Sequence, residues 1–261
     1  MADVLGFDEE ASRRVEAIYL TADIVRQRRT ILDALKLAPG ERVLDVGLGP
    51  GLLVAEIAAL VGSKGRVHGI DISEDMVAMA QRRCAELPNV TLSTGDAHNL
   101  KDESLSYDVV VCIQVLEYVA DPDQVIREIH RVLRPGGRVA IMATDWDSCI
   151  WSSPDPPQTA RIIEAWNCHC PHPHLPTTLG PKLREHGFSL SECGVVPILS
   201  VGHHEGTYSD GMIDLIGSYV GQHTGITNSE VTRWARGLRD LGERCGYFFS
   251  LNRFLFNATR V

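Results

Sequence analysis

The segment of residues 41–51, ERVLDVGLGPG, runs an apolar strand directly into three glycines and then into a helix-forming stretch. Its valines and leucine are typical of a buried parallel strand. Gly47, Gly49 and Gly51 let the backbone turn sharply with no Cβ in the way, so a ligand can approach the main chain closely. A helix predicted over 52–61 would point its free N–H groups and its positive end at an anionic or nucleotide-like ligand.

The spacing of these glycines fits a dinucleotide-binding fingerprint poorly. The third glycine of that fingerprint would fall at Leu52, and Gly51 comes one place early. An acidic residue does stand about 20 residues further on. It is Asp71, at the end of a second predicted strand over 66–70, where its carboxylate could bind two ribose hydroxyls.

Two further predicted strands also end in polar residues. The strand over 90–93 leads into Asp96, and the strand over 107–113 leads into Gln114. The carboxyl ends of parallel strands meet at one edge of an open α/β sheet, which is where ligands bind in such folds. The sequence therefore predicts that these groups share a site.

Five motifs follow one another in order: LDVGLGPG, GIDIS before the helix EDMVAMAQ, GDAHNL, SYDVVVCIQVLEYV and HRVLRPGGRVAI. Their order and spacing across residues 41–142 resemble the class I S-adenosylmethionine-dependent methyltransferases. The similarity is greatest to the small-molecule branch of the ubiquinone-biosynthesis and arsenite methyltransferases. The resemblance implies a Rossmann-like, mostly parallel seven-stranded α/β sheet with an antiparallel last strand, N-terminal cover helices and inserted lid elements.

The resemblance also implies a role for each matched residue in binding S-adenosylmethionine. It assigns Asp45, Gly47, Gly49, Gly51 and Gln114 to the methionine portion, Asp71 to the ribose hydroxyls, Ile72 and Met76 to the adenine face, Asp96 to the adenine amino group, and the backbone N–H of Ala97 to the ring. Singly, these residues could equally be caps or turn formers. Their joint placement at strand ends favours the cofactor.

Charge and composition limit the class of partner. The chain has 261 residues, a formal net charge of −9 and a pI near 5.5, which argues against a nucleic-acid surface. Neither a secretory signal nor an apolar run long enough to span a membrane is evident, so we expect a cytoplasmic protein without membrane contact. Seven scattered cysteines form neither a zinc pattern nor a disulfide framework. A small-molecule substrate and a monomer or homodimer are expected.

The chain divides into predicted cover helices over 1–38 and a methyltransferase domain over 39–261. Within the first part, residues 12–35 are predicted to be helical, with a break near positions 21 and 22. Substrate-side insertions are predicted at 144–176, after a fifth strand predicted over 138–143, and at 202–246, after the sixth strand. The first insertion carries four prolines between Pro154 and Pro171 and several tryptophans. Loops at this edge of the sheet are free to vary around a fixed cofactor site, so substrate specificity is expected there.

Methyl transfer from a sulfonium needs neither a metal nor a covalent intermediate, but a hydroxyl or ammonium acceptor must lose a proton to a base. Asp145 follows the fifth strand, His169 lies in the first insertion, and the resemblance makes Tyr19 a pocket candidate. Further candidates for the base are Glu117, Tyr118, His172 and His174. Trp146, Trp166 and Tyr118 are predicted to contact substrate, although tryptophans in a lid are often only packing residues.

Several alternatives stay open at this point. Cys168 and Cys170 suggest an arsenite-type or thiol methyltransferase, but the cysteines that such enzymes use at separated positions are not all matched. The neighbouring histidines match no common zinc pattern, so no metal is predicted. A methyltransferase for macromolecules and a noncatalytic cofactor-binding module are the remaining classes. The acceptor atom, whether oxygen, nitrogen or carbon, does not follow from the sequence.

Overall fold

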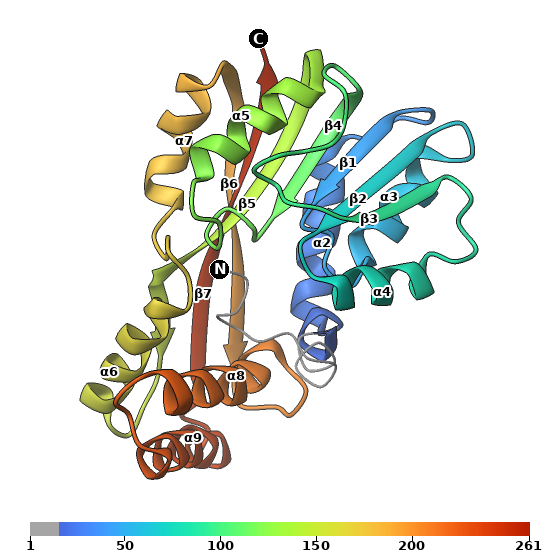
Figure 1. The fold of residues 1–261 in the computed structure, drawn as a ribbon. Coiled ribbons are helices and arrows are strands. Elements are labelled where there is room, and N and C mark those ends of the chain that lie inside the picture. Colours follow the sequence, from blue (N-terminus) through green and yellow to red (C-terminus); the bar gives the residue numbers. More distant parts are fainter. Residues whose placement is uncertain (1–15) are drawn as a thin grey trace.

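The computed structural model describes residues 16–261, which form a seven-stranded sheet with helices on both faces (Figure 1). The strand order is β3-β2-β1-β4-β5-β7-β6. The strands are β1 (Arg42–Val46), β2 (Arg66–Asp71), β3 (Val90–Thr94), β4 (Tyr107–Ile113), β5 (Leu133–Trp151), β6 (Phe188–Val201) and β7 (Phe248–Arg260).

Strand pairing confirms the predicted fold class. The neighbours from β3 to β5 pair in parallel, whereas β7 is antiparallel to both β5 and β6. The order reverses between β1 and β4, and open α/β sheets bind ligands at the strand ends beside such a switch point. The predicted limits of β4 agree with the structure, as do those of the helix after the glycines.

Helices cover both faces of the sheet. They are α2 (Ala22–Leu35), α3 (Leu52–Val61), α4 (Glu74–Arg83), α5 (Pro122–Val132), α6 (Pro156–Trp166), the 3-10 turn η1 (Asn167–His169), α7 (Pro176–Glu185), α8 (Tyr208–His223) and α9 (Asn228–Glu243). Residues of α5 and α7 share one core with the sheet, and those of α2, α3 and α4 share another. The predicted break near position 21 separates helical residues 16–19 from α2; predicted helical residues 12–15 lie outside the described range.

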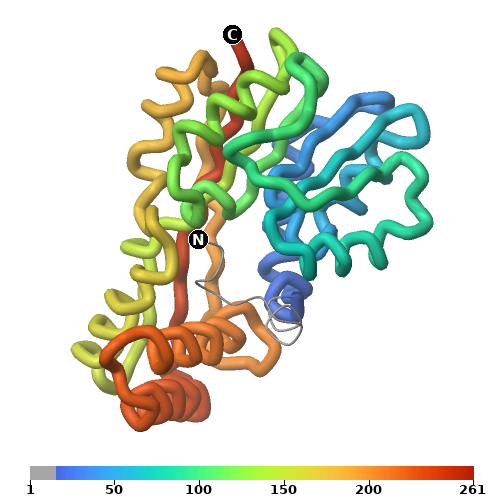
Figure 2. Tube along the Cα trace, in the orientation of Figure 1, coloured from blue at the N-terminus to red at the C-terminus, as the bar shows by residue number. Residues whose placement is uncertain are grey.

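The fifth strand is longer than predicted. The expected strand covered 138–143, but β5 continues to Trp151 because β7 pairs with it again beyond a register shift between Asp145 and Ile150. The long ends of β5, β6 and β7 carry α6, α8 and α9, which lie together below the sheet in Figure 2. A third core of aromatic side chains fills this extension. The predicted segments 144–176 and 202–246 supply these three helices.

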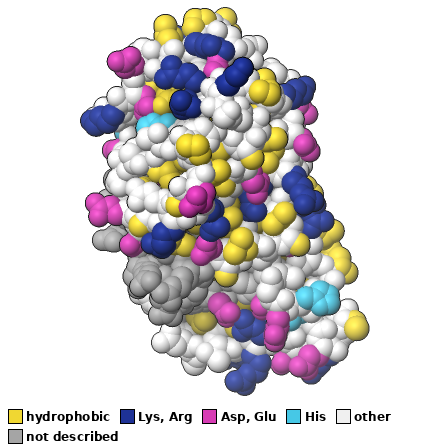
Figure 3. Space-filling view, turned by 90° about the vertical axis from the view of Figure 1, so that its right-hand side faces the viewer, with side chains coloured by type: hydrophobic (Ala, Val, Ile, Leu, Met, Phe, Trp, Pro, Cys, Tyr) yellow, Lys and Arg dark blue, Asp and Glu magenta, His cyan; other side chains and the backbone are white. Residues whose placement is uncertain are grey.

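Two surface features bear on the expected partners. No helix among residues 16–261 combines the length and the apolar character needed to cross a membrane. On the face drawn in Figure 3, basic and acidic side chains alternate and do not gather into a single basic patch.

Candidate functional site

The glycine loop has a backbone that other residues would not adopt. The φ angles of Gly47, Gly49 and Gly51 are +76°, +53° and +78°. A Cβ on Gly47 would lie 2.2 Å from a methyl group of Val115, and a Cβ on Gly51 would lie 2.9 Å from the Cα of Ala80. The glycines therefore let β1 turn tightly against the end of β4 and against α4.

The carboxylate of Asp71 fastens this loop to the end of β2. Its Oδ2 accepts the backbone N–H of Gly49 at 2.9 Å, and its Oδ1 accepts that of Ser73 at 2.9 Å. Burial raises the pKa of Asp71, and these two hydrogen bonds oppose that rise. A carboxylate has about four acceptor positions, so both oxygens retain capacity for ligand hydroxyls.

Asp45 is a second acidic group of the loop. It is the penultimate residue of β1, within the buried run of that strand, and is almost fully enclosed. Burial raises its pKa to about 7, and the nearby charge of Asp71 acts in the same direction. The two carboxylates are thus electrostatic neighbours at the carboxyl ends of adjacent strands.

The residues predicted to contact the adenine differ in how exposed they are. Ile72 is 60% exposed, an uncommon position for a large aliphatic side chain and one that a flat ring could cover. Met76 is buried, so its side chain is not offered to the surface. Asp96 is exposed and bonded to the N–H and ring of His98, which lower its pKa, and Ala97 is partly buried against the core.

Gln114 occupies the end of β4 in a strained conformation. Its φ is +56°, in the left-handed region that residues other than glycine rarely adopt. Its backbone N–H donates to the carbonyl of Met142 at 2.7 Å, and its side-chain amide donates to the hydroxyl of Thr144 at 3.1 Å. Such strain is concentrated at ligand sites, and here it brings the amide between β4 and β5.

Glu117 is more prominent in the structure than in the sequence. It is 0% exposed; Oε1 accepts the N–H of Thr144 at 3.2 Å and Oε2 has no partner among the described residues. Burial raises its pKa to about 7, opposed by backbone hydrogen bonds and by the positive charge of Arg253. The glutamate after a strand end was a sequence-level candidate for the base, but its complete burial depends on tertiary packing.

The first insertion and the end of β4 build an aromatic cluster. His169 is fully buried and stacks on Trp166 with ring centroids 3.8 Å apart, while Trp146 meets both rings edge-on. The Nδ1 of His169 lies 2.6 Å from the carbonyl of Trp166, so that nitrogen carries the proton. The other nitrogen accepts the hydroxyl of Tyr118 at 3.4 Å. Burial lowers the pKa of His169 to about 4.

Tyr19 connects the glycine loop to the groups deeper in the fold. A Cβ on Gly49 would lie 3.7 Å from its ring. Burial raises the pKa of Tyr19 to about 12, and the charges acting on it include those of Arg253, Asp71 and Glu117. Its hydroxyl therefore lies within electrostatic range of both the loop and the buried Glu117.

Within residues 16–261, no side-chain hydrogen bond or ion pair joins the carboxylate of Asp145 to the glycine loop, to Glu117 or to the aromatic cluster. Its carboxylate lies 3.2 Å from Nδ1 of His174, which also lies 3.3 Å from a carboxylate oxygen of Asp147. Successive strand residues face opposite sides, and the neighbouring Thr144 points toward Gln114. Ligand atoms of Asp145, Asp147 and His174 lie within 4.8 Å of one another, an arrangement already explained by these ion pairs.

The two cysteines between the tryptophan and the histidines differ in environment. Cys168 is exposed, whereas Cys170 is buried. Burial raises the pKa of the Cys170 thiol to about 12. The structure therefore does not present them as a matched pair of thiolates.

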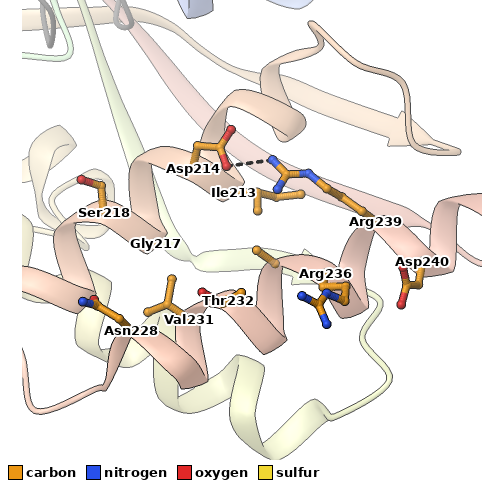
Figure 4. Close-up of a pocket in the computed structure, with 11 residues that line it drawn as sticks. Ile213, Asp214, Gly217, Ser218, Asn228, Val231, Thr232, Arg236, Arg239 and Asp240 are labelled. Atoms are coloured by element: carbon orange, nitrogen blue, oxygen red, sulfur yellow. Dashed lines mark hydrogen bonds and ion pairs between the residues drawn. The ribbon is translucent and has the colours of Figure 1, made fainter.

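Two grooves on the surface of residues 16–261 lie elsewhere. One of 630 Å³ separates α8 from α9 and is lined by charged residues such as Arg239 and Asp214, which pair with each other (Figure 4). Another, of 480 Å³, is lined by residues including His172, His174 and Lys182. Neither includes any of the strand-end residues, so the burial and contacts above define the site better than groove volume does.

Comparison with known proteins fits this geometry. A family model described as a methyltransferase domain matches residues 43–137, which include all the strand ends from β1 to β4. Residues 43–137 are thus similar to a methyltransferase domain, as the motifs of the class I S-adenosylmethionine-dependent methyltransferases predicted. An uncharacterized 37.1 kDa protein in a transposon of Streptomyces fradiae is 43% identical over 160 residues, covering 59% of this chain and 46% of that relative.

A functionally named relative extends the comparison. Demethylmenaquinone methyltransferase of Staphylococcus epidermidis is 36% identical over 117 residues, covering 45% of this methyltransferase chain and 48% of the relative. The chain thus spans about half the length of the curated relatives it matches.

A solved structure matches nearly the whole methyltransferase chain. Phosphoethanolamine N-methyltransferase 2 of Haemonchus contortus, in complex with S-adenosylmethionine, has a TM-score of 0.63 and 19% identity, covering 97% of this chain and 57% of that chain. At this identity the likeness shows the fold. The methyltransferase-domain match itself supports S-adenosylmethionine as the cofactor.

Proposed function

We propose that this methyltransferase transfers the methyl group of S-adenosylmethionine to an oxygen, nitrogen or carbon atom of a small molecule. The observation that carries the proposal is the meeting of two groups of residues at one sheet edge. One is the glycine loop fastened by Asp71, and the other is the buried set around Glu117 and the aromatic cluster. The ring of Tyr19 lies close to Gly49 of the loop, and the charge of Glu117 acts on its hydroxyl.

The residues present fit the cofactor. The loop can pack tightly against Val115 and Ala80 because Gly47 and Gly51 lack a Cβ. Asp71 would accept the ribose hydroxyls, the exposed Ile72 would cover one face of the adenine, and Gln114 would contact the methionine portion. Bound there, the cofactor supplies an electrophilic methyl group on a sulfonium.

The acceptor side of the proposal rests on burial. In-line displacement disperses the charge on sulfur, so positioning and partial removal of water supply much of the rate. The walls formed by Trp146, Trp166 and Tyr118 would exclude water from the acceptor. The resulting site suits a compact, partly apolar molecule better than a polymer.

Glu117 is the base that we propose for acceptors that lose a proton. Its Oε2 has no partner within residues 16–261, and its pKa of about 7 lies near the pH at which a base is most effective. His169 is held as a neutral acceptor behind the hydroxyl of Tyr118, which suits a positioning role. Asp145 stays a predicted base, although its described partners are His174 and Asp147.

Methyl transfer tests the proposal directly. The purified protein is given S-adenosylmethionine labelled on the methyl group together with a cell extract, and label is measured separately in small molecules, protein and nucleic acid. We expect label in small molecules, reduced roughly tenfold or more in Asp71→Asn, because charge-assisted hydrogen bonds are lost. The exposed neighbour substitution Asp75→Asn serves as the control. Label confined to protein or nucleic acid would overturn the small-molecule assignment.

A further inference from the structure

Arg253 on β7 is a buried cation that has no role in the function proposed above. It is 2% exposed, although its strand neighbours are largely aromatic and aliphatic. It lies opposite Thr144 of β5 in the antiparallel register. Thr144 is the residue that forms hydrogen bonds with both Gln114 and Glu117. The sequence analysis overlooked it; the only signal was one charged residue inside the apolar run YFFSLNRFLFNA.

The hydrogen-bond partners of Arg253 are both uncharged. Nη1 donates to the side-chain carbonyl of Gln27 on α2, and Nη2 donates to the hydroxyl of Tyr208 on α8 at 2.9 Å. The guanidinium also lies over the ring of Tyr208, 5.0 Å from its centroid. Gln27 and Tyr208 are themselves buried.

One donor of Arg253 is left without a partner. Its Nε is buried and unbonded among the described residues. In a guanidinium, the Nε–H and one Nη2–H point in parallel and match the two oxygens of a carboxylate. Arg253 therefore keeps part of its planar donor edge available while Gln27 and Tyr208 hold the rest of the group in place.

Glu117 does not neutralise this cation by contact. No ion pair joins the two within residues 16–261, although the charge of Arg253 acts on Glu117 and on Tyr19. Both unbonded atoms, Nε of Arg253 and Oε2 of Glu117, are buried. A donor edge and an acceptor oxygen held apart in this way are complementary to a ligand that carries both an anionic oxygen and a proton to give.

We propose that Arg253 binds an anionic oxygen group of the methyl acceptor, so that the substrate is a small organic acid such as a carboxylate or an acidic phenol. This inference rests on the function proposed above. The geometry assigns Tyr208 and Gln27 as positioning residues for the guanidinium. A buried cation whose protein partners are neutral is unfavourable in the empty protein, and an anionic ligand removes that penalty.

The test separates potential acceptors by charge before the reaction. A small-molecule extract is divided on an anion-exchange resin, and each fraction is offered to the protein with labelled S-adenosylmethionine. We expect transfer only with the retained, anionic fraction. We expect this transfer to fall roughly 30-fold or more in Arg253→Met, since a buried charged contact is lost, and less in Arg253→Lys, which keeps the charge but not the fork. Arg161→Met, at an exposed arginine of α6, is the control.

A melting curve without ligand distinguishes binding from a structural role. If Arg253 is held for a ligand, Arg253→Met melts at the same or a higher temperature, while its affinity for the cofactor stays the same. A large drop in melting temperature would show that the protein itself supplies a counter-charge, and would overturn the inference. Transfer from the unretained fraction would also overturn it and leave the proposed function intact. No transfer from either fraction would remove both.

Discussion

The cofactor side and the acceptor side of the proposed site are held in place by different kinds of interaction. On the cofactor side, between β1 and β4, backbone turns and short polar contacts set the geometry, as in the bond from Gly49 to Asp71. On the acceptor side, the extended β5 and β7 with α6 and α8 enclose aromatic rings and two buried charged side chains. The first half depends on local sequence motifs, and the second depends on residues far apart in the chain.

The comparison is most sharply tested by removing Glu117. Glu117→Gln keeps an acceptor for the N–H of Thr144 but cannot take a proton. Transfer to a proton-losing acceptor should fall by about 10²- to 10⁴-fold, as for loss of a general base. In the native enzyme the rate should rise with pH through about 7, the pKa of Glu117, and this rise should vanish in the variant.

Steady-state rates measured across pH check this expectation, with the exposed Glu164→Gln as control. An unchanged pH profile in Glu117→Gln would assign the proton transfer to another group. Asp145 would then return as the leading candidate, and Asp145→Asn the next variant to measure.

On the cofactor side, we expect a substitution of Gly51 to reduce both stability and cofactor binding. Gly51→Ala places a Cβ 2.9 Å from the Cα of Ala80 at a φ of +78°, so backbone must move. We expect a loss of about 3 kcal/mol or more in unfolding free energy and weaker cofactor binding. Gly40→Ala is the matched control, because Gly40 has a φ of +90° but no atom within 4 Å of the added Cβ.

Calorimetric titration measures the affinity for the cofactor, and thermal unfolding measures the loss of stability separately. Gly40→Ala should lose only about 1–2 kcal/mol from left-handed strain and keep its affinity for the cofactor. Equal losses of affinity in both variants would mean that strain, and not the close approach at the loop, governs binding.

Buried acidity gives the fold a pH dependence of known sign. The folded pKa of Glu117 is about 7, against an ordinary pKa of 4.5 for a glutamate, so the folded state binds more protons than the unfolded state between these pH values. Stability should therefore fall as pH rises from about 4.5 to about 7, by roughly 2–3 kcal/mol for this group. Glu117→Gln should remove that part of the slope and be the more stable protein at pH 8.

Denaturant unfolding of both proteins at pH 5 and pH 8 provides the measurement. Asp45 has a similarly raised pKa, so the variant should retain a weaker slope of the same sign. A variant less stable than the native protein at pH 8 would show that the Glu117 charge is favourably paired.

The smallest effect on stability is expected from a change between α6 and α9. Trp234 of α9 donates its indole N–H to the hydroxyl of Thr159 on α6 at 3.1 Å. Thr159→Val leaves that buried donor unpaired and should reduce unfolding free energy by about 1–2 kcal/mol, with the affinity for the cofactor unchanged. The exposed Thr232→Val on α9 controls for the change of side chain, and a fall in cofactor affinity would show that the two halves are coupled.

What the sequence could predict follows the same division. The glycine loop, Asp71 and the strands β1 to β4 were predictable because each depends on a short run with a strict backbone requirement. The limit of β5 was predicted wrongly, since its continuation to Trp151 depends on pairing with β7, about 100 residues away. Arg253 gave almost no local signal, because its meaning comes from Gln27 and Tyr208 on distant helices.

The most direct test is a crystal structure of the protein with S-adenosylhomocysteine, the product of the cofactor after transfer. We expect the ribose hydroxyls to lie within hydrogen-bond distance of Asp71 and the sulfur to face Tyr19, Glu117 and Arg253. A nucleoside bound away from Asp71, or a sulfur facing away from Glu117 and Arg253, would contradict the account.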